Sequence, residues 1–371
     1  MIDLSNLNVQ KNDFISKFLN NISKFKRVML WGLSESADAA IEFFTEHNIK
    51  VDGIYDNDKS KSGTLYKGVE IFYPGDDVFC EDTALVITCS YYENIRLSLI
   101  DRDPDIDNRM FMYDGYFKDN EYLYDNDKVL SLINKNYDEL GDDKSKVLYE
   151  ALLKYRYIRD IRIIKELYES RSECYLDKVF LDRFKDGLYL DVGSYNADFV
   201  TTLSDRVDVS NSKFYIFEPN KIFSKNIEDN LSGKYNLNVF KMALCDEEGK
   251  MAFQQIASST SHLVDKKYNA YRDKLDNNVE YVKTNKLDNV INNEKVFGIK
   301  VDIEGAEMSM LIGATEVIKR DRPIMMISIY HRWNDLWEIQ DYISGLNLNY
   351  IFYIRHYSLS VAKTILYCIP E

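Results

Sequence analysis

The chain has 371 residues, which is long enough for two domains that each bury a core. Its hydrophobic fraction of 45% and charged fraction of 29% are those of an ordinary globular protein. The formal net charge of −14 opposes a nucleic-acid partner and docking on anionic lipid, because both need a basic face. We therefore expect no nucleic acid and no membrane among its partners.

The first predicted domain is Rossmann-like and covers residues 1–118. Residues 27–31, which are apolar after Arg27, predict a strand, followed by a glycine-containing turn and an amphipathic helix to about His47. Further strands are predicted at residues 51–55, 84–89 and 110–113. The order strand, helix, strand implies a parallel sheet with right-handed crossovers.

The ligand of this first domain is less clear than its fold. Gly32 and Ser34, with Asp56 at the next strand end, form only a partial dinucleotide fingerprint, which opposes NAD binding. Residues 56–69, in which Asp56-Asn57-Asp58 is followed by Lys59, Lys61, Gly63 and Gly68, resemble small nucleotide-sugar-binding domains. That resemblance implies binding of a nucleotide-linked sugar or a carrier. A structural or dimerising role, with a homodimer, is an equal alternative.

A helical connector is predicted over residues 119–182. The run from residue 144 to residue 168 has apolar side chains at helical spacing and also carries several arginines. We expect this connector to lie over the domain that follows it.

A second α/β domain is predicted over residues 183–371. Its expected strands cover residues 188–190, 214–217, 237–242, 297–303, 324–330, 350–354 and 364–368. The spacing of the last two strands suits an antiparallel pair at the end of a parallel sheet.

The segment from Lys300 to Glu307 is the strongest functional signal. If the strand continues through residue 304, Lys300, Asp302 and Glu304 share one face at its carboxyl end. Buried charges cost desolvation energy unless they are paired or used, and ligands of open α/β sheets bind at the carboxyl ends of strands. This pattern predicts a functional site.

A second signal lies at the first strand of the same domain. Gly193, in the turn after Asp191, lets the backbone approach a ligand closely. Glu218 ends the next strand, where an acidic side chain can accept both hydroxyls of a ribose. A cap for the helix after Pro219 is the alternative role for Glu218.

Several motifs in this order resemble FkbM-type S-adenosylmethionine-dependent methyltransferases. The matching motifs are Asp191-Val192-Gly193, Phe217-Glu218-Pro219-Asn220, Ala243-Leu244 through Gly249, Thr284 through Asp288, Ile299 through Glu307, Leu311 through Ala314, and Ile329-Tyr330-His331. The resemblance covers residues 143–371. It implies a class I methyltransferase fold, with a seven-stranded, mostly parallel sheet and an antiparallel last strand. It also implies S-adenosylmethionine as cofactor and O-methylation of hydroxyls on sugars or related metabolites.

The resemblance also implies where the ligands are held. Cofactor contacts are expected at Asp191, Gly193, Ser194, Asn196, Glu218, Pro219, Ala243, Leu244 and Tyr175. The connector, including Arg156 and Tyr175, is expected to cap the site, with Arg156 and His262 as acceptor contacts; a solvated loop is the alternative for the segment around His262. The chain departs from the family pattern at Ala197, where a second glycine is usual, and this puts cofactor affinity in doubt.

Methyl transfer needs in-line positioning and removal of the hydroxyl proton. We expect Asp302 or His331 to be the general base, with Glu304 orienting the acceptor or cofactor. Lys300 is expected to lower the pKa of Asp302 or to hold a developing oxyanion. A Mg²⁺ ion held by Asp302 and Glu304 is the alternative, and we expect no metal. A packed structural role is the alternative for His331.

The five cysteines are scattered and form no C-x-x-C pair, which favours reduced thiols over disulfides or zinc. No stretch has the length of a transmembrane helix, and the N-terminus lacks the core of a signal peptide. We therefore expect a cytoplasmic enzyme with a small-molecule acceptor. The competing class is a non-catalytic scaffold that retains the cofactor-binding fold.

Overall fold

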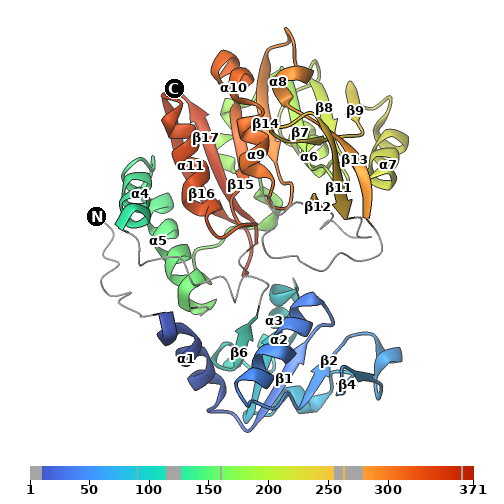
Figure 1. Ribbon diagram of the computed structural model, residues 1–371, viewed down its shortest axis with the longest axis vertical. Helices are drawn as coiled ribbons and strands as arrows, with labels where there is room; N and C mark the ends of the chain where they lie inside the picture. Colours follow the sequence, from blue (N-terminus) through green and yellow to red (C-terminus); the bar gives the residue numbers. More distant parts are fainter. Residues whose placement is uncertain are drawn as a thin grey trace. The chain divides into compact units, whose positions relative to one another are not determined.

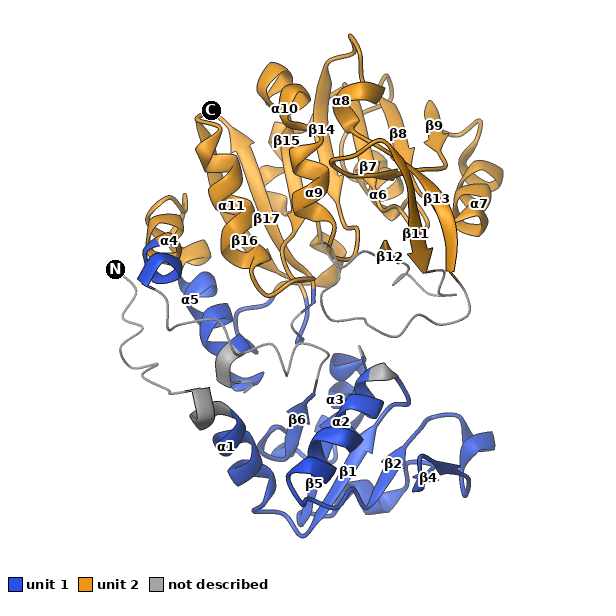
Figure 2. Cartoon of the chain, in the orientation of Figure 1, with its two compact units in different colours: residues 1–131, 147–168, 358–362 blue, residues 132–146, 169–357, 363–371 orange. Residues whose placement is uncertain are grey.

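The computed structural model describes residues 11–89, 91–113, 127–158, 161–254, 262–263, 279–360 and 362–371. The chain forms two compact units (Figure 2). Unit 1 comprises Met1–Ser131, Val147–Tyr168 and Ser358–Ala362, and unit 2 comprises Leu132–Lys146, Glu169–Tyr357 and Lys363–Glu371. Residues 119–182, expected to form a separate connector, are distributed between the two units.

Unit 1 is built on a six-stranded sheet in the order β3-β4-β2-β1-β5-β6 (Figure 1). Its strands are β1 (Arg27–Trp31), β2 (Gly53–Tyr55), β3 (Leu65–Tyr66), β4 (Val69–Phe72), β5 (Thr83–Ile87) and β6 (Met110–Met112). All neighbours are parallel except β3 and β4. The four predicted strands are present, although β2 and β5 are shorter than expected. The short β3 and β4 were not predicted.

The helices of unit 1 pack on this sheet through regularly spaced apolar side chains. They include α1 (Lys11–Ile22), α2 (Glu35–Glu46) and α3 (Tyr92–Ile100). Phe18 of α1 and Phe43 of α2 join Leu30, Ile54 and Val86 of the strands in one buried cluster. Apolar side chains of both helices therefore close over one face of the sheet.

Unit 2 contains a seven-stranded sheet in the order β16-β17-β15-β14-β7-β8-β9. Its strands are β7 (Leu188–Val192), β8 (Lys213–Phe217), β9 (Leu237–Phe240), β14 (Val296–Val301), β15 (Ile324–Ser328), β16 (Tyr350–His356) and β17 (Thr364–Pro370). Only β17 runs antiparallel to its neighbours. The predicted class I methyltransferase sheet is therefore confirmed.

Helices cover both faces of this sheet. Phe199 of α6 (Asp198–Arg206) and Ile227 of α7 (Lys221–Leu231) pack with Tyr189 and Ile216 of the strands in one buried core. The helices α9 (Glu307–Ile312), α10 (Thr315–Asp321) and α11 (Asp335–Gly345) lie together on the other face (Figure 1).

A small four-stranded sheet that was not predicted completes unit 2. Its order is β10-β13-β11-β12, with β10 (Ala243–Leu244), β11 (Gly249–Gln254), β12 (His262–Leu263) and β13 (Val279–Asn285), and α8 (Leu287–Val290) follows it. Phe253 and Leu263 of this sheet pack with Ala306, which follows β14. The small sheet thus forms one wall beside the end of β14.

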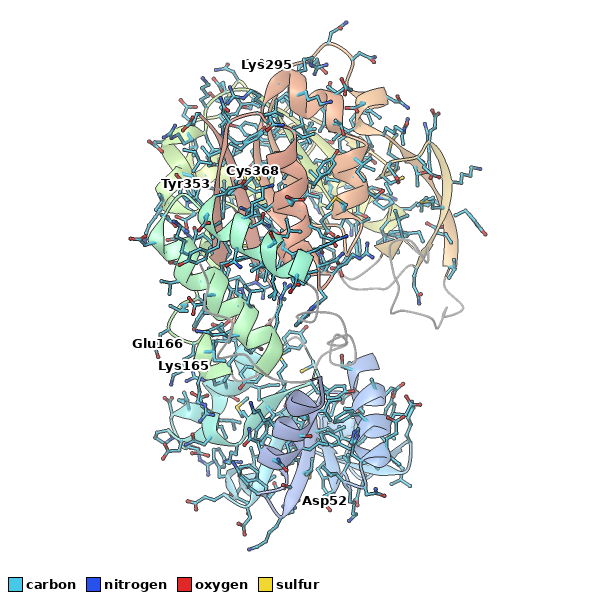
Figure 3. All side chains as sticks on the ribbon, turned by 60° about the vertical axis from the view of Figure 1, so that its left-hand side comes forward. Asp52, Lys165, Glu166, Lys295, Tyr353 and Cys368 are labelled. Atoms are coloured by element: carbon cyan, nitrogen blue, oxygen red, sulfur yellow. The ribbon has the colours of Figure 1, made fainter. Side chains whose placement is uncertain are left out.

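The predicted strand at residues 297–303 ends earlier than expected. Lys295, labelled in Figure 3, directly precedes β14, and the strand stops at Val301. Glu304 has φ +58°, a left-handed conformation that breaks the strand. The expectation that Lys300, Asp302 and Glu304 share one strand face was therefore wrong. β15 also stops early, at Ser328, so His331 lies in the loop beyond it.

The connector region is less helical than predicted. It contains α4 (Asp127–Asp138) and α5 (Asp143–Ile158), followed by the short 3₁₀ turns η6 (Ile161–Ile163), η7 (Arg171–Glu173) and η8 (Lys178–Arg183). In unit 2, buried Arg355 of β16 pairs with Asp142 at 2.6 Å and with Asp177 at 3.1 Å, which ties these segments to the sheet. No described helix is long and apolar enough to cross a membrane.

Candidate active site

The turn after β7 lies directly against the end of β14. Gly193 has φ +77°, and Tyr195 and Ala197 are also left-handed, with φ +52° and +60°. A Cβ at position 193 would lie only 2.0 Å from the backbone oxygen of Asp302. Only glycine fits this close approach of the two segments, and the expected contact of Gly193 with a ligand stays a prediction.

Lys300 supports this turn through an ion pair and a hydrogen bond. Its Nζ lies 3.0 Å from Oδ1 of Asp191 and donates to the carbonyl oxygen of Gly193 at 2.6 Å. Ser194 Oγ donates to the other oxygen of Asp191 at 2.5 Å. Lys300 and Asp191 are both buried. The structure therefore brings Lys300, Asp191 and Ser194 together as a support for the turn.

A cavity opens at the carboxyl ends of β7, β8 and β14, and it holds about 560 Å³ of space when the solvent-filled mouth is included. Seven of the predicted site residues line it, namely Gly193, Glu218, Pro219, Ala243, Leu244, Asp302 and Glu304. Asp191, Ser194, Asn196, Lys300, Tyr175 and His331 are not among the lining residues. Ala197 is also absent from the lining and is packed in the core, so its methyl group does not narrow the cavity.

Glu218 supplies a buried carboxylate to this cavity. Its two oxygens accept the backbone N–H groups of Asn220 at 2.8 Å and Tyr195 at 3.1 Å. Burial raises the pKa of Glu218, while these N–H donors and the charge of Lys300 oppose the rise. Each carboxylate oxygen keeps a second acceptor position, so Glu218 can still bind a pair of hydroxyls.

The remaining wall of the cavity is mostly apolar. Phe217, Phe223, Phe253 and Leu263 line it beside Ala243 and Leu244. Tyr195 and Phe223 pack edge to face, with ring centroids 4.6 Å apart. Such a wall suits a flat heteroaromatic ring, and Glu218 suits a ribose diol. The residues present therefore fit an adenosine-containing cofactor such as the S-adenosylmethionine expected from the sequence.

Asp302 lies at the centre of a hydrogen-bond network. Oδ2 accepts from Tyr175 Oη at 2.6 Å and from Lys363 Nζ at 3.0 Å. Oδ1 accepts from Ser328 Oγ and Tyr330 Oη, each at 2.9 Å. Burial raises the pKa of Asp302, but Lys363, His331, Lys300 and the Tyr175 hydrogen bond outweigh burial and hold the pKa well below its usual range.

His331 lies between carboxylates. Its Nδ1 is 2.7 Å from Oε1 of Glu307, and its Nε2 is 3.4 Å from Asp302 and 3.6 Å from Glu304. Burial lowers the pKa of His331, but Glu307 and Glu304 outweigh burial and raise the pKa well above its usual value. Nε2 makes no hydrogen bond to any described residue.

Asp302, Glu307 and His331 offer donor atoms within 4.8 Å of one another, which is close enough for a metal ion. Their donor atoms are largely occupied, however. Asp302 accepts from four groups, and Glu307 accepts from the backbone N–H groups of Ile303 and Gly305 as well as facing His331. Because an ionised carboxylate has about four acceptor positions, a metal bound through Asp302 would have to displace existing partners. The donor set therefore disfavours the Mg²⁺ alternative.

The other predicted site residues lie elsewhere. Tyr175 contacts Asp302, and its ring lies 5.4 Å from Nζ of Lys300. Arg156 is buried on the part of α5 that belongs to unit 1, so its expected role as an acceptor contact stays a prediction. His262 lies in β12, but its side chain is outside the described residues.

Sequence reasoning missed several members of the site. Glu307 belongs to the quoted motif, and its fixed spacing after Asp302 was the available signal. Tyr330 belongs to the quoted Ile329-Tyr330-His331 motif, whereas Lys363 carries no local signal, because its approach to Asp302 depends on the antiparallel pairing of β15 with β17. The aromatic cavity wall was missed for the same reason, since Phe253 and Leu263 reach it through the small sheet.

Comparisons with known proteins agree with this geometry. Residues 191–352 match the family model described as the methyltransferase FkbM domain. No curated protein matches the chain. The structure of methyltransferase FkbM from Methylobacillus flagellatus is 17% identical, with a TM-score of 0.64, and the alignment covers 95% of this chain and 93% of that one.

Two further solved structures align with a smaller part of this chain. A putative rRNA-methylase from Clostridium thermocellum is 10% identical, with a TM-score of 0.37, over 55% of this chain and 97% of that one. An S-adenosylmethionine-dependent O-methyltransferase from Thermotoga maritima is 10% identical, with a TM-score of 0.31, over 54% of this chain and 66% of that one.

The matched segment begins at Asp191 below the glycine turn and includes Glu218, Asp302 and His331. Residues 191–352 are therefore a methyltransferase FkbM domain, which makes the chain an S-adenosylmethionine-dependent methyltransferase.

Proposed function

We propose that the methyl acceptor is a hydroxyl group on a sugar, a nucleotide-linked sugar or a related metabolite. The observation that carries this proposal is the pair of carboxylates, Asp302 and Glu304, that lines the same cavity as Glu218. Carboxylates accept hydrogen bonds from hydroxyls, and Glu304 lines the cavity with a side chain that is 16% exposed. A partly exposed carboxylate on the cavity suits a ligand that carries hydroxyl groups.

Bound S-adenosylmethionine supplies a methyl group that is already activated by its positively charged sulfur. Within the chain, Gly193 permits close approach of the backbone, and Glu218 and the apolar wall hold the nucleoside part. The protein must then place the acceptor oxygen in line with the methyl group and give the hydroxyl proton a carboxylate to go to.

A mass-shift assay tests this proposal. The full chain is incubated with S-adenosylmethionine and a panel of free sugars, nucleotide-linked sugars and small alcohols, with an amine panel in parallel. We expect a product heavier by one methylene group from a hydroxyl-bearing acceptor. Methylation confined to amines would contradict the proposal.

The alternative is a non-catalytic protein that retains the cofactor-binding fold. The departure at Ala197 first suggested it, but the methyl group of Ala197 is in the core and not in the cavity. The same assay separates the two cases, since a scaffold binds S-adenosylmethionine in a calorimetric titration without transferring its methyl group.

For unit 1 we propose binding of the nucleotide part of the acceptor, with dimer formation as the alternative. The hydroxyl of Thr88 donates to the carbonyls of Trp31 and Gly32, and a Cβ on Gly32 would lie 2.7 Å from Cys89. The turn after β1 lacks the second and third glycines of the dinucleotide fingerprint, so we do not propose NAD. Titration of the full chain with UDP-, GDP-, CDP- and TDP-linked sugars, together with sedimentation, distinguishes the two roles.

We further propose that the enzyme works in the cytoplasm, without nucleic acid or membrane as partner. All five cysteines are free thiols, which suits a reducing compartment. The net charge of −14 opposes binding to nucleic acid and to anionic lipid. Fractionation of cells that express the tagged chain tests the compartment.

A further inference from the structure

The hydrogen bonding of Asp302 argues against its expected role as general base. Tyr175 and Lys363 occupy one oxygen, and Ser328 and Tyr330 occupy the other. An ionised carboxylate has about four acceptor positions, and here four donors fill them. To take a proton, Asp302 would have to lose one of these donors. A proton acceptor for the hydroxyl must therefore come from another group on the same cavity.

Glu304 is the other carboxylate at this end of the cavity. It lines the cavity, and its side chain is 16% exposed, so an acceptor can reach it. Its backbone has φ +58°, a conformation that is uncommon for a residue with a long side chain. Strained backbone of this kind tends to persist at functional sites, where the surrounding structure enforces it.

Glu307 is the group that enforces this conformation. Its side chain is fully buried, and its oxygens accept the backbone N–H groups of Ile303 at 2.9 Å and Gly305 at 3.0 Å, the two neighbours of Glu304. Oε1 of Glu307 also lies 2.7 Å from Nδ1 of His331. One buried carboxylate thus fixes both the turn that carries Glu304 and the orientation of the imidazole.

His331 completes the arrangement. With Nδ1 held by Glu307, the ring directs Nε2 toward Glu304 at 3.6 Å and Asp302 at 3.4 Å. Glu307, Glu304 and Asp302 surround the ring, and Asp335 and Arg332 approach from the start of α11. A positively charged imidazole between these carboxylates attracts the Glu304 side chain and holds it in position, because opposite charges attract strongly at a buried site.

We propose that Glu304 is the catalytic carboxylate that accepts the proton of the acceptor hydroxyl, and that His331 and Glu307 are the positioning residues that hold it. In this step the acceptor oxygen forms a bond to the methyl carbon and the carbon–sulfur bond breaks, with its electron pair passing to sulfur. The proton moves from the acceptor oxygen to Oε of Glu304. This assignment rests on the proposed transfer to a hydroxyl.

The first experiment removes the charge of Glu304. Glu304→Gln is compared with Glu304→Asp and with Glu316→Gln, a matched change at a side chain that is 74% exposed. With an acceptor that the wild type methylates, we expect kcat of Glu304→Gln to fall by roughly 10²–10⁴-fold. Glu304→Asp should recover part of the rate, and Glu316→Gln should match the wild type.

Binding of S-adenosylmethionine is measured on the same proteins. It should stay within about twofold of the wild type in Glu304→Gln, because loss of a proton acceptor acts on the chemical step. Unchanged kcat in Glu304→Gln overturns the assignment while leaving the proposed function standing. If the wild type methylates no hydroxyl in the panel, the proposed function fails first and the assignment fails with it.

The second experiment needs no acceptor and reports the positioning residues. The chain has four histidines, so the imidazole ¹⁵N signals of His331 can be identified by comparison with His331→Gln. We expect His331 to stay charged to a higher pH than an ordinary histidine in the wild type, and Glu304→Gln and Glu307→Gln each to lower its titration midpoint. An unchanged midpoint in both variants, with a folded protein, overturns the proposed arrangement.

A third variant separates strain from function. Glu304→Gly removes the carboxylate and relieves the left-handed conformation, so we expect it to unfold at the same temperature as the wild type or higher, and to be inactive. Activity in Glu304→Gly comparable to that of the wild type would contradict the proposal.

Discussion

The close contact between Gly193 and the end of β14 gives a quantitative prediction for Gly193→Ala. The new Cβ would lie 2.0 Å from the backbone oxygen of Asp302 and 2.7 Å from Cγ2 of Ile303. Gly233 provides a matched control, because it also has positive φ, +83°, but no atom within 4 Å of an added Cβ. Both substitutions carry the left-handed strain, and only the first adds the clash.

The left-handed strain, less the entropy that alanine removes from the unfolded chain, should destabilise Gly233→Ala by about 1 kcal/mol. The clash with backbone adds roughly 1–3 kcal/mol of overpacking, so Gly193→Ala should be destabilised by about 2–4 kcal/mol. Urea unfolding of both variants measures the difference, and a calorimetric titration should show that only Gly193→Ala loses S-adenosylmethionine binding. Equal destabilisation, with binding intact in both, would refute the reasoning.

Other substitutions in unit 2 test the remaining electrostatics. Lys300→Met leaves the buried Asp191 without its ion-pair partner, so it should destabilise the protein by about 3–5 kcal/mol in urea unfolding. The double variant Lys300→Met/Asp191→Asn should recover part of this stability, because it also removes the unpaired charge. A loss below about 1 kcal/mol in Lys300→Met would show that the ion pair contributes little to the stability of the turn. Burial and the charge of Glu307 raise the pKa of Asp335 to about 8, above its unfolded value of 3.8. The folded state therefore holds the Asp335 proton more tightly than the unfolded state does. The stability that comes from this bound proton is lost as the pH rises from 3.8 through 8. Asp335→Asn lacks this titration, so its stability relative to the wild type should increase between pH 5 and pH 8, by at most about 1.4 kcal/mol per pH unit; a pH-independent difference would contradict the shift.

The sequence predicted those strands well that can be recognised from their own residues alone. The apolar run at residues 27–31 matches β1, because charge and glycine bound it on either side. Alternation failed at β14, since it cannot reveal that Glu304 adopts a left-handed conformation and ends the face shared with Lys300. In the structure Lys300 supports the turn at Asp191, whereas the sequence pattern predicted that it lies beside the reacting groups.

The partners of Asp302 could not be predicted from local patterns. Tyr330 approaches Asp302 because β15 pairs with β14. Lys363, which is 61 residues from Asp302 in the sequence, approaches it because β17 pairs antiparallel to β15. The walls from Phe253 and Leu263 likewise depend on pairing between β11 and β12. Glu218 and Gly193 could be predicted as residues of the site, because their position directly after a strand is enough to place them there.

The central claim is that the cavity between Gly193 and Glu218 in unit 2 binds S-adenosylmethionine. The most direct measurement is a calorimetric titration of S-adenosylmethionine into the full chain and into Glu218→Ala, with Glu316→Ala as the surface control. We expect one saturable site in the wild type and the control, and at least tenfold weaker binding in Glu218→Ala, equivalent to about 1.4 kcal/mol for the lost ribose hydrogen bonds. Equal affinity in all three proteins, or no binding to the wild type, would contradict the claim.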